Sequence, residues 1–269
     1  MQNMEKYHIQ EGFNYKAFVS LCMREISRFC AVYHQTVIAP LVNAVLMLCI
    51  FAFALAPDSY QDQGYNLFSA PSVQFIACGL IMMSTIQNAF QNSSSSLIIT
   101  KMNGCMYDIL TPPFGACEFL FAMITGGVAR GLMVSSLLVL CSMLFLNMHV
   151  AHVTWCIVYI LLASCFAAQI GIFTGFFSNS FEQSSAITNY IISPLSLLSG
   201  TFYSMQKMPS VLVTINNYNP FYYLIDGFRC STLCLEKDCS GGLLFVLALN
   251  CALFLLLRHL FNKGWRIKV

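Results

Sequence analysis

Residues 153–177 read VTWCIVYILLASCFAAQIGIFTGFF, a stretch that contains no Asp, Glu, Lys or Arg. An α-helix needs about 20 mostly apolar residues to cross a hydrocarbon core of about 30 Å. This stretch is long enough and apolar enough to do so. It therefore predicts a membrane-spanning helix from about Val153 to Phe177, and it identifies lipid as part of the solvent of this chain.

The composition supports the same interpretation. Hydrophobic residues make up 58% of the 269 residues and charged residues only 9%, and the mean hydropathy is +0.69. A soluble globular domain carries about 25% charged residues, so this chain lacks the polar residues to cover a water-facing surface. We expect a single integral membrane domain over residues 1–269, without a secretory signal peptide, because the first apolar run begins only near Thr36.

Further apolar runs bring the predicted number of membrane-spanning helices to six, and the fold class to an all-α polytopic membrane protein. The fifth of these spans begins after Glu182, and Pro194 and Gly200 predict that it is interrupted. The other predicted spans are Thr36–Ala56, Val73–Gln91, Phe119–Leu146 and Gly242–Phe261.

Three segments outside these spans have distinct patterns. Residues 13–33 are amphipathic, which is typical of a helix in the membrane interface, although an ordinary packed helix fits the pattern as well. Residues 92–118 are polar and contain Lys101 and a proline pair, and we expect them to connect two spans in the cytoplasm. Residues 206–241 are of mixed polarity, and we interpret them as a re-entrant region on the outer side.

The distribution of Lys and Arg predicts the orientation, because these residues concentrate on the cytoplasmic side. With both termini inside, the inner segments contain Lys6, Lys16, Arg24, Arg28, Lys101, Lys263, Arg266 and Lys268. The outer segments then contain only Lys207, Arg229 and Lys237. We therefore expect a multi-pass protein of the cell (inner) membrane with cytoplasmic termini.

Polar side chains form stripes along two of the predicted spans. They are Ser84, Gln87, Asn88 and Gln91 in the second span, and Asn189 and Ser193 in the fifth. Polar groups inside a membrane either bond to a neighbouring helix or face a water-filled path. These six residues are therefore candidates for lining a translocation path, with helix–helix bonding as the alternative.

Arg130 is an intramembrane charge in the third predicted span. An arginine at the centre of a span costs about 2.5–3.5 kcal/mol on insertion scales unless it is paired or hydrated. Its neighbours in Gly126–Gly131 allow close approach of another backbone. The alternative is that the span begins later and that Arg130 extends to the cytoplasmic surface.

Several sequence features of other protein classes are absent. No G-x-x-x-x-G-K-[ST] phosphate loop occurs, so we do not expect the chain to bind ATP in that way, and no Cys/His grouping has metal-site spacing. Most of the 13 cysteines lie singly in apolar runs. Cys230, Cys234 and Cys239 lie on the predicted outer side, where Cys234 and Cys239 could close a small loop, but three free thiols are equally compatible.

An ordered set of motifs resembles the ABC-2 type permeases of ABC transporters, in particular the small stand-alone permeases grouped with drug, polysaccharide and Nod-factor exporters. The motifs are Phe75–Met83, Gly126–Gly131, Ser193–Leu195, Ser199–Tyr203, Asn219–Tyr223 and Asp226–Arg229. The resemblance implies six spans, an N-terminal interfacial helix, a broken fifth span with an outer re-entrant part, and a dimer of permeases.

The resemblance also implies a separate ABC ATPase subunit that binds ATP and Mg²⁺, so this chain is expected to be a transport subunit and not itself an enzyme. The ATPase-coupling residues that it implies here are Gly104, Asp108, Ile109, Leu110, Thr111 and Pro112. This chain departs from the family at Cys105–Tyr107, where family members are often more polar. The expected partners are the ATPase, a second copy of the permease and membrane lipid, and nucleic acid is not expected.

Two other functions fit a polytopic membrane protein. An ion-coupled secondary transporter or channel would place acidic residues near the centres of its spans, and this sequence places none there. A membrane scaffold that transports nothing would not need polar stripes or an interrupted fifth span. The residues and the resemblance together favour the permease of an ABC exporter.

Overall fold

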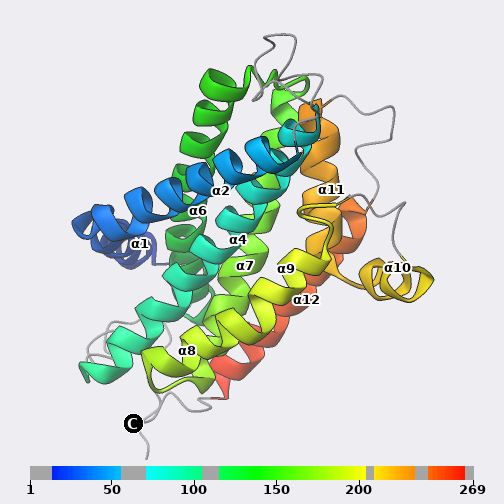
Figure 1. The fold of residues 1–269 in the computed structure, drawn as a ribbon. Helices are drawn as coiled ribbons and strands as arrows, with labels where there is room; N and C mark the ends of the chain where they lie inside the picture. Colours follow the sequence, from blue (N-terminus) through cyan, green and yellow to red (C-terminus); the bar gives the residue numbers. More distant parts are fainter. Residues whose placement is uncertain (1–13, 56–70, 105–114, 204–208, 234–241, 264–269) are drawn as a thin grey trace, which may run out of the picture.

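The computed structural model describes residues 14–55, 71–104, 115–203, 209–233 and 242–263, and its elements there are all helices (Figure 1). The candidate membrane-spanning helices among them number five: His34–Phe51, Ser72–Met102, Ala116–Leu146, Val153–Phe177 and Leu243–Asn262. The elements are α1 (Tyr15–Ala31), η1 (His34–Ile38), α2 (Ala39–Leu55), α4 (Pro71–Met102), α6 (Ala116–Leu146), α7 (Val153–Phe177), α8 (Phe181–Ile187), η3 (Thr188–Ile192), α9 (Ser193–Leu198), α10 (Ser210–Asn217), α11 (Pro220–Leu233) and α12 (Leu243–Asn262).

Helices α4, α6 and α7 form the centre of the bundle and approach one another through small residues. A Cβ atom on Gly171 of α7 would lie 2.4 Å from the carbonyl oxygen of Phe90 in α4, and a Cβ on Gly127 of α6 would lie 2.6 Å from Ser93 Oγ. Within a membrane, helix association depends on such close packing because lipid chains are as apolar as the side chains. The glycines therefore set the short distances between these three helices.

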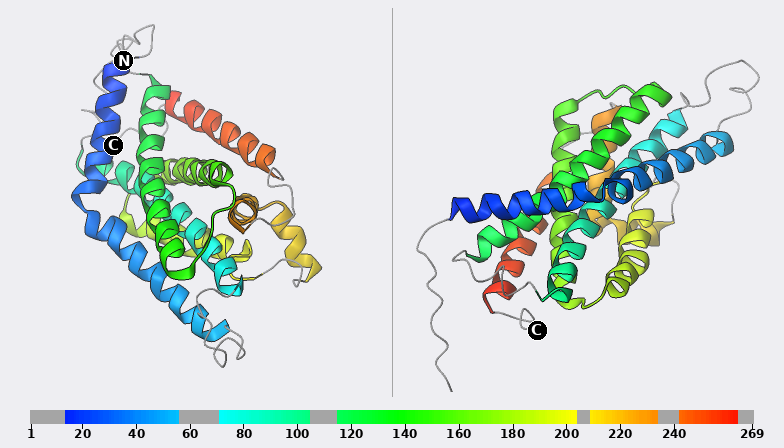
Figure 2. Two further views of the ribbon diagram at one scale, coloured as in Figure 1. Left: turned by 90° about the horizontal axis from the view of Figure 1, so that it is seen from above. Right: turned by 90° about the vertical axis from the view of Figure 1, so that its left-hand side faces the viewer.

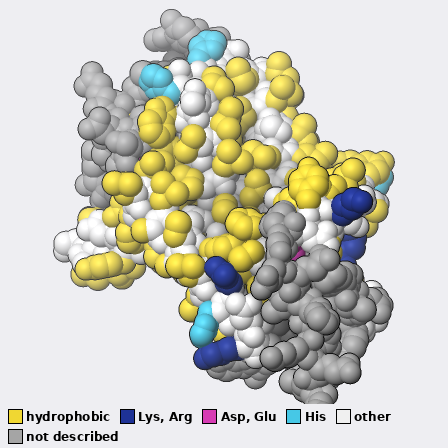
Figure 3. All heavy atoms as spheres, turned by 180° about the vertical axis from the view of Figure 1, so that it is seen from behind, with side chains coloured by type: hydrophobic (Ala, Val, Ile, Leu, Met, Phe, Trp, Pro, Cys, Tyr) yellow, Lys and Arg dark blue, Asp and Glu magenta, His cyan; other side chains and the backbone are white. Residues whose placement is uncertain are grey.

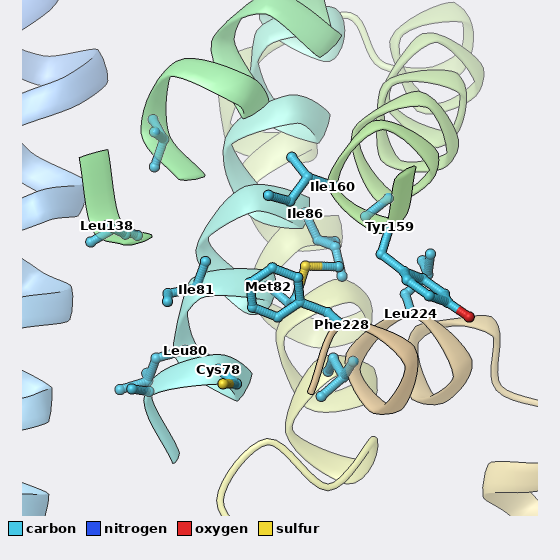
Figure 4. Packing of buried hydrophobic residues seen from close by; sticks show 14 of the residues in the cluster. Cys78, Leu80, Ile81, Met82, Ile86, Leu138, Tyr159, Ile160, Leu224 and Phe228 are labelled. Carbon is cyan, nitrogen blue, oxygen red and sulfur yellow. The ribbon is translucent and has the colours of Figure 1, made fainter. Parts of the chain in front are cut away.

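The buried apolar core lies around α4, α7 and α11. Figure 4 shows Met82, Ile86, Tyr159, Leu224 and Phe228 packed together in this core. The side chain of Tyr159 lies against α11 at Gly227, where an added Cβ would lie 2.1 Å from the tyrosine Cζ. Helix α11 is consequently enclosed by the bundle.

The observed helices confirm most of the predicted spans, and the second one continues as a helix beyond the predicted end of the span at Gln91. Helix α4 continues to Met102, so the first part of the predicted connection 92–118 is helical. The serine-rich sequence indicated a polar connection between spans, yet Ser93, Ser94 and Ser96 are buried between helices. Ser94 Oγ, for example, lies 2.6 Å from Ser184 Oγ of α8, which satisfies both hydroxyls.

The predicted interruption of the fifth span takes the form of a π-helical turn. Helices α8, η3 and α9 follow one another directly, and none of them belongs to the five candidate spans. The N–H group of Ser193 donates to the carbonyl of Thr188, which is the wider spacing of a π turn. The chain remains helical through Pro194, because the irregularity precedes it, and the helix ends at Leu198.

Helix α1 lies along the outside of the bundle and crosses α6 (Figure 2). The predicted amphipathic helix of residues 13–33 is thus present at Tyr15–Ala31, while its location in the membrane interface stays a prediction. On the face seen in Figure 3, hydrophobic side chains cover most of the upper part, and Lys and Arg lie at mid-height or below. That distribution is typical of a surface that meets lipid.

The region predicted to be re-entrant contains α10 and α11. Helix α11 has 14 residues, which corresponds to about 21 Å and is too short for a crossing of about 30 Å. The backbone N–H groups of Ala151 and His152 donate to the carbonyls of Thr232 and Ser231 near its end. Cys230 takes part in a disulfide bond, which corrects both the expectation of three free thiols and that of a loop between Cys234 and Cys239 alone, and its partner lies outside the described residues.

Candidate functional site

A charged junction lies where α1 meets α4 and α6. Glu25 is 1% exposed, and its carboxylate accepts hydrogen bonds from Arg24 Nη2 at 2.9 Å and from Arg28 Nη2 at 3.3 Å. A buried carboxylate is stable only when it is paired and hydrogen-bonded. The two arginines are partly exposed and thus connect the buried carboxylate to the surface of the bundle.

Arg28 extends this junction to α4. Its Nη2 donates to the backbone and side-chain oxygens of Asn92 at 2.8 and 2.9 Å, and its Nη1 donates to Ser95 Oγ at 3.3 Å. Burial lowers the pKa of the Arg28 guanidinium, and the neighbouring Glu25 carboxylate opposes that shift. The guanidinium therefore binds α1 to the C-terminal half of α4.

Gly126 explains how α1 can come so close. A Cβ on this residue would lie 2.7 Å from Glu25 Cβ and 3.3 Å from Asn92 Nδ2, so a larger residue would push α1 away from α6. The predicted close approach at Gly126–Gly131 is present. It is made by α1 at Gly126, and by α7 at Gly131, where a Cβ would lie 2.4 Å from Ser164 Oγ.

Arg130 lies one helical turn beyond Gly126 and is 7% exposed. Its Nη2 donates to Asn88 Oδ1 at 2.9 Å, and Asn88 Nδ2 in turn donates to the backbone carbonyl of Ser84. The guanidinium is enclosed between α6 and α4 and does not extend to the surface. Two of the residues singled out in the sequence therefore form one contact between helices.

The remaining path candidates fall into two groups. Gln87 Nε2 donates to Ser193 Oγ at 3.2 Å, so this pair joins α4 to the start of α9. Gln91 and Asn189 are exposed at the surface of the chain, and Ser84 is half-buried. The six candidates therefore do not line one common channel within the chain. Their role in a path stays a prediction, and any such path would run along the outer surface of α4 and α8–α9.

The C-terminal end of α4 leads directly into the predicted ATPase-coupling segment. Gly104 is exposed and has φ = 68°, a left-handed conformation that suits the residue after a helix C-terminus. Lys101 Nζ donates to the carbonyls of Gly175 and Phe176 at 2.8 and 2.7 Å, which fixes this end of α4 to the end of α7. The other coupling residues, Asp108, Ile109, Leu110, Thr111 and Pro112, lie outside the described residues.

Sequence reasoning did not identify Glu25, Lys101 or Arg229 as residues that join helices. Glu25 occurs on the apolar side of α1 with Cys22 and Phe29, and an acidic residue in that register was a usable signal. Lys101 was noted only as a charge that indicates orientation, and Arg229 as such a charge and as the last residue of a family-like motif, and neither was expected to bond to a distant part of the chain. Their partners are backbone carbonyls at the end of α7 for Lys101 and in the turn after α9 for Arg229, and a sequence pattern contains no signal for such contacts.

Residues 16–233 match the family described as ABC-2 type transporter, and this match extends from α1 to the end of α11. The chain belongs to the ABC-2 type transporter family. The similarity covers the junction of α1, α4 and α6, the α8–α9 stretch and the α10–α11 region. This permease is therefore a membrane-spanning subunit of an ABC transporter.

Curated relatives agree with this assignment. The permease is 30% identical over 213 residues to the inner membrane transport permease YadH of Escherichia coli K12, and the alignment covers 79% of this chain and 81% of YadH. The YadH proteins of Escherichia coli O157:H7 and Shigella flexneri match with the same identity and coverage. The resemblance seen in the sequence is thus confirmed for most of the chain.

Proposed function

We propose that this permease is the membrane-spanning subunit of an ABC exporter, and that a separate ATPase subunit, which binds ATP and Mg²⁺, drives cargo outward through two copies of it. The chain contains no phosphate loop of its own, in agreement with a separate ATPase. Its place would be the inner cell membrane with both termini in the cytoplasm. The name of its relative YadH, an inner membrane transport permease, supports that location.

The observation that carries the proposal is that α4 is one unbroken helix from Pro71 to Met102. It contains Gln87 and Asn88 of the predicted path, and it ends beside Gly104, where the predicted coupling segment begins. A helix of this length extends about 48 Å, clearly more than the hydrocarbon core. A displacement at its inner end therefore reaches the level of the path without crossing a loop.

The mechanism follows from this geometry. ATP binding would move the ATPase subunits together, and residues Gly104 to Pro112 would pass that movement to α4. The equilibrium between inward- and outward-facing arrangements shifts because ATP binds one of them better. The bond between Gln87 and Ser193 would carry the start of α9 along with α4, so that the surface with Asn189 moves as well.

Photo-cross-linking would test the docking site. A photo-reactive amino acid at Asn103, which is exposed next to Gly104, is expected to cross-link to a co-expressed ATPase of the P-loop class. The matched control is Asn147, which is exposed and directly follows the C-terminal end of α6. No cross-link is expected there. Equal cross-linking from both positions, or from Asn147 alone, would contradict the proposed docking side.

An ion-coupled secondary transporter or channel stays the alternative function. The described part of the chain contains four acidic residues. Glu25 is paired with arginines in α1, and Glu118 caps the start of α6, where it accepts from the N–H of Gly115 at 2.5 Å. Glu182 is exposed on α8, and Asp226 is half-buried in α11, and neither α8 nor α11 is among the five candidate membrane-spanning helices. Family membership favours the ATP-driven transporter over this alternative.

A further inference from the structure

Arg229 of α11 is buried at the point where α4, α11 and the turn after α9 meet. It is 4% exposed. Its Nη2 donates to the carbonyls of Gly200 and Thr201 at 3.1 and 3.2 Å, and its Nε donates to the carbonyl of Phe75 at 3.2 Å. The guanidinium also lies 3.5 Å from the centroid of the Phe75 ring. One side chain thus contacts α4, which carries path candidates, and the turn that follows α9.

The turn after α9 is pressed onto α4 at this place. A Cβ on Gly79 of α4 would lie 2.3 Å from the carbonyl oxygen of Thr201 and 3.0 Å from Arg229 Nη2, and Gly200 has φ = 79°. The carbonyls at the end of a helix have no partner within the helix and carry partial negative charge. A buried guanidinium therefore stabilises this turn in its position against α4.

Helix α11 is held to α9 at a second place. Asn219, just before α11, donates to Ser199 Oγ at 2.8 Å and to the carbonyl of Leu195 at 3.1 Å. Asn216 donates to the carbonyl of Leu198 at 2.6 Å. The end of α9 is thus bonded to the α10–α11 region on one side, and through Arg229 to α4 on the other.

We propose that Arg229 is a positioning residue that joins the outer ends of α4, α9 and α11 into one rigid unit, so that movement of α4 reaches the outer end of α9. The part of this inference that concerns movement rests on the proposed function. The rigid unit itself rests only on the contacts of Arg229. About 40 Å of unbroken α4 separate Phe75 from Met102, so the unit would respond to a displacement that begins at the inner end.

The test is a distance measurement within one chain. Spin-labelled unnatural side chains at Ser72 of α4 and Leu198 of α9, both exposed, avoid the 13 native cysteines. Labelled chain is diluted with unlabelled chain and reconstituted with its ATPase. We expect one narrow distance distribution whose mean shifts by less than about 2 Å, a small helix shift, between nucleotide-free and vanadate-trapped complexes.

The substitution Arg229→Gln removes the forked donor and is expected to broaden this distribution and to separate the nucleotide-free and trapped means. Arg229→Lys keeps the charge but loses the forked pair of donors, so we expect a distance distribution of intermediate width. This variant replaces Arg229→Gln in the test if the glutamine variant does not fold. Arg258→Gln, which removes an exposed arginine of α12, is the matched control and should match the unsubstituted protein.

A distribution as narrow in Arg229→Gln and Arg229→Lys as in the control would overturn the inference, as would a separation of the labels in the unsubstituted protein on trapping. The nucleotide-free arm needs no ATPase. Broadening there, in a chain with which no ATPase associates, would support the rigid unit and contradict the proposed function. If the complex hydrolyses ATP and both Arg229 variants still give narrow distance distributions, the role of Arg229 is contradicted and the proposed function is not.

Discussion

Individual buried charges in this permease mark the places where helices cross. Glu25 lies against Gly126, and Arg229 lies against Gly79. Arg130, one turn from Gly126, bonds to Asn88 of the adjacent helix. In each case a small residue allows close approach, and the polar side chain then finds partners that lipid could not supply. Charge in this membrane protein therefore contributes to the specificity of helix packing.

Replacing Glu25 by Gln is expected to loosen α1. The substitution leaves the guanidinium groups of Arg24 and Arg28 without their carboxylate, and the loss of charged hydrogen bonds costs about 1–3 kcal/mol, with the partial exposure of both arginines reducing the effect. The measurement is the apparent melting temperature in detergent. Glu182→Gln on exposed α8 is the control, and an equal loss in both variants would contradict the role of Glu25.

The bond between Arg130 and Asn88 can be tested with a double-mutant cycle. Asn88→Ala leaves a buried guanidinium without its amide partner, which we expect to destabilise the protein by about 1–3 kcal/mol. Because Arg130→Gln removes the same bond, the combined loss should be smaller than the sum by about 0.5 kcal/mol or more. Asn88→Ala combined with Arg258→Gln is the additive control. Additive losses for the Arg130 pair would disprove the contact.

The sequence was informative about which residues are unusual and less so about their partners. Arg130 was identifiable because an arginine inside an apolar run is rare, and Gly126–Gly131 correctly predicted close packing. Gln91 shares the helical register of Gln87, yet its side chain is exposed at the surface of the chain. Partners such as the carbonyls of Gly200 and Thr201 depend on tertiary structure alone.

Among the helices, a polar sequence marks the end of a helix only where its polar side chains are exposed to water. Helix α7 begins at Val153 and ends at Phe177, as the apolar run predicts. Helix α4 continues past the predicted span because its serines, although polar, are buried between helices. Pro194 was expected to break the fifth span, and the π turn before it allows the helix to continue.

Gly227→Ala tests the packing of α11 against α7. The new Cβ would lie 2.1 Å from Tyr159 Cζ, and overpacking of a core costs about 1–3 kcal/mol. We expect a lower melting temperature, largely restored by the second substitution Tyr159→Leu. Gly115→Ala, whose Cβ would meet only Glu118 Oε2 at 3.9 Å, is the control. An unchanged melting temperature for Gly227→Ala would show that α11 packs differently.

For the whole molecule, composition and apolar runs were sufficient to predict an all-helical membrane protein, and the ordered motifs were sufficient to predict its family. The helix crossings depend on glycines in α4, α6, α7 and α11 that the apolar pattern does not distinguish from other small residues. The proposed function requires that movement of a separate ATPase is transmitted along α4. The unbroken helix from Pro71 to Met102 is suited to that role.

The most direct measurement is affinity purification of the full-length permease in mild detergent, followed by mass spectrometry and an ATPase assay. The account predicts that a P-loop ATPase co-purifies, that the preparation hydrolyses ATP, and that both are lost when residues 104–112 are replaced by a Gly/Ser stretch. Gly/Ser replacement of exposed Asn147, His149 and Ala151, which follow the C-terminal end of α6, should retain both. A permease that purifies without an ATPase in every mild detergent tested would contradict the account.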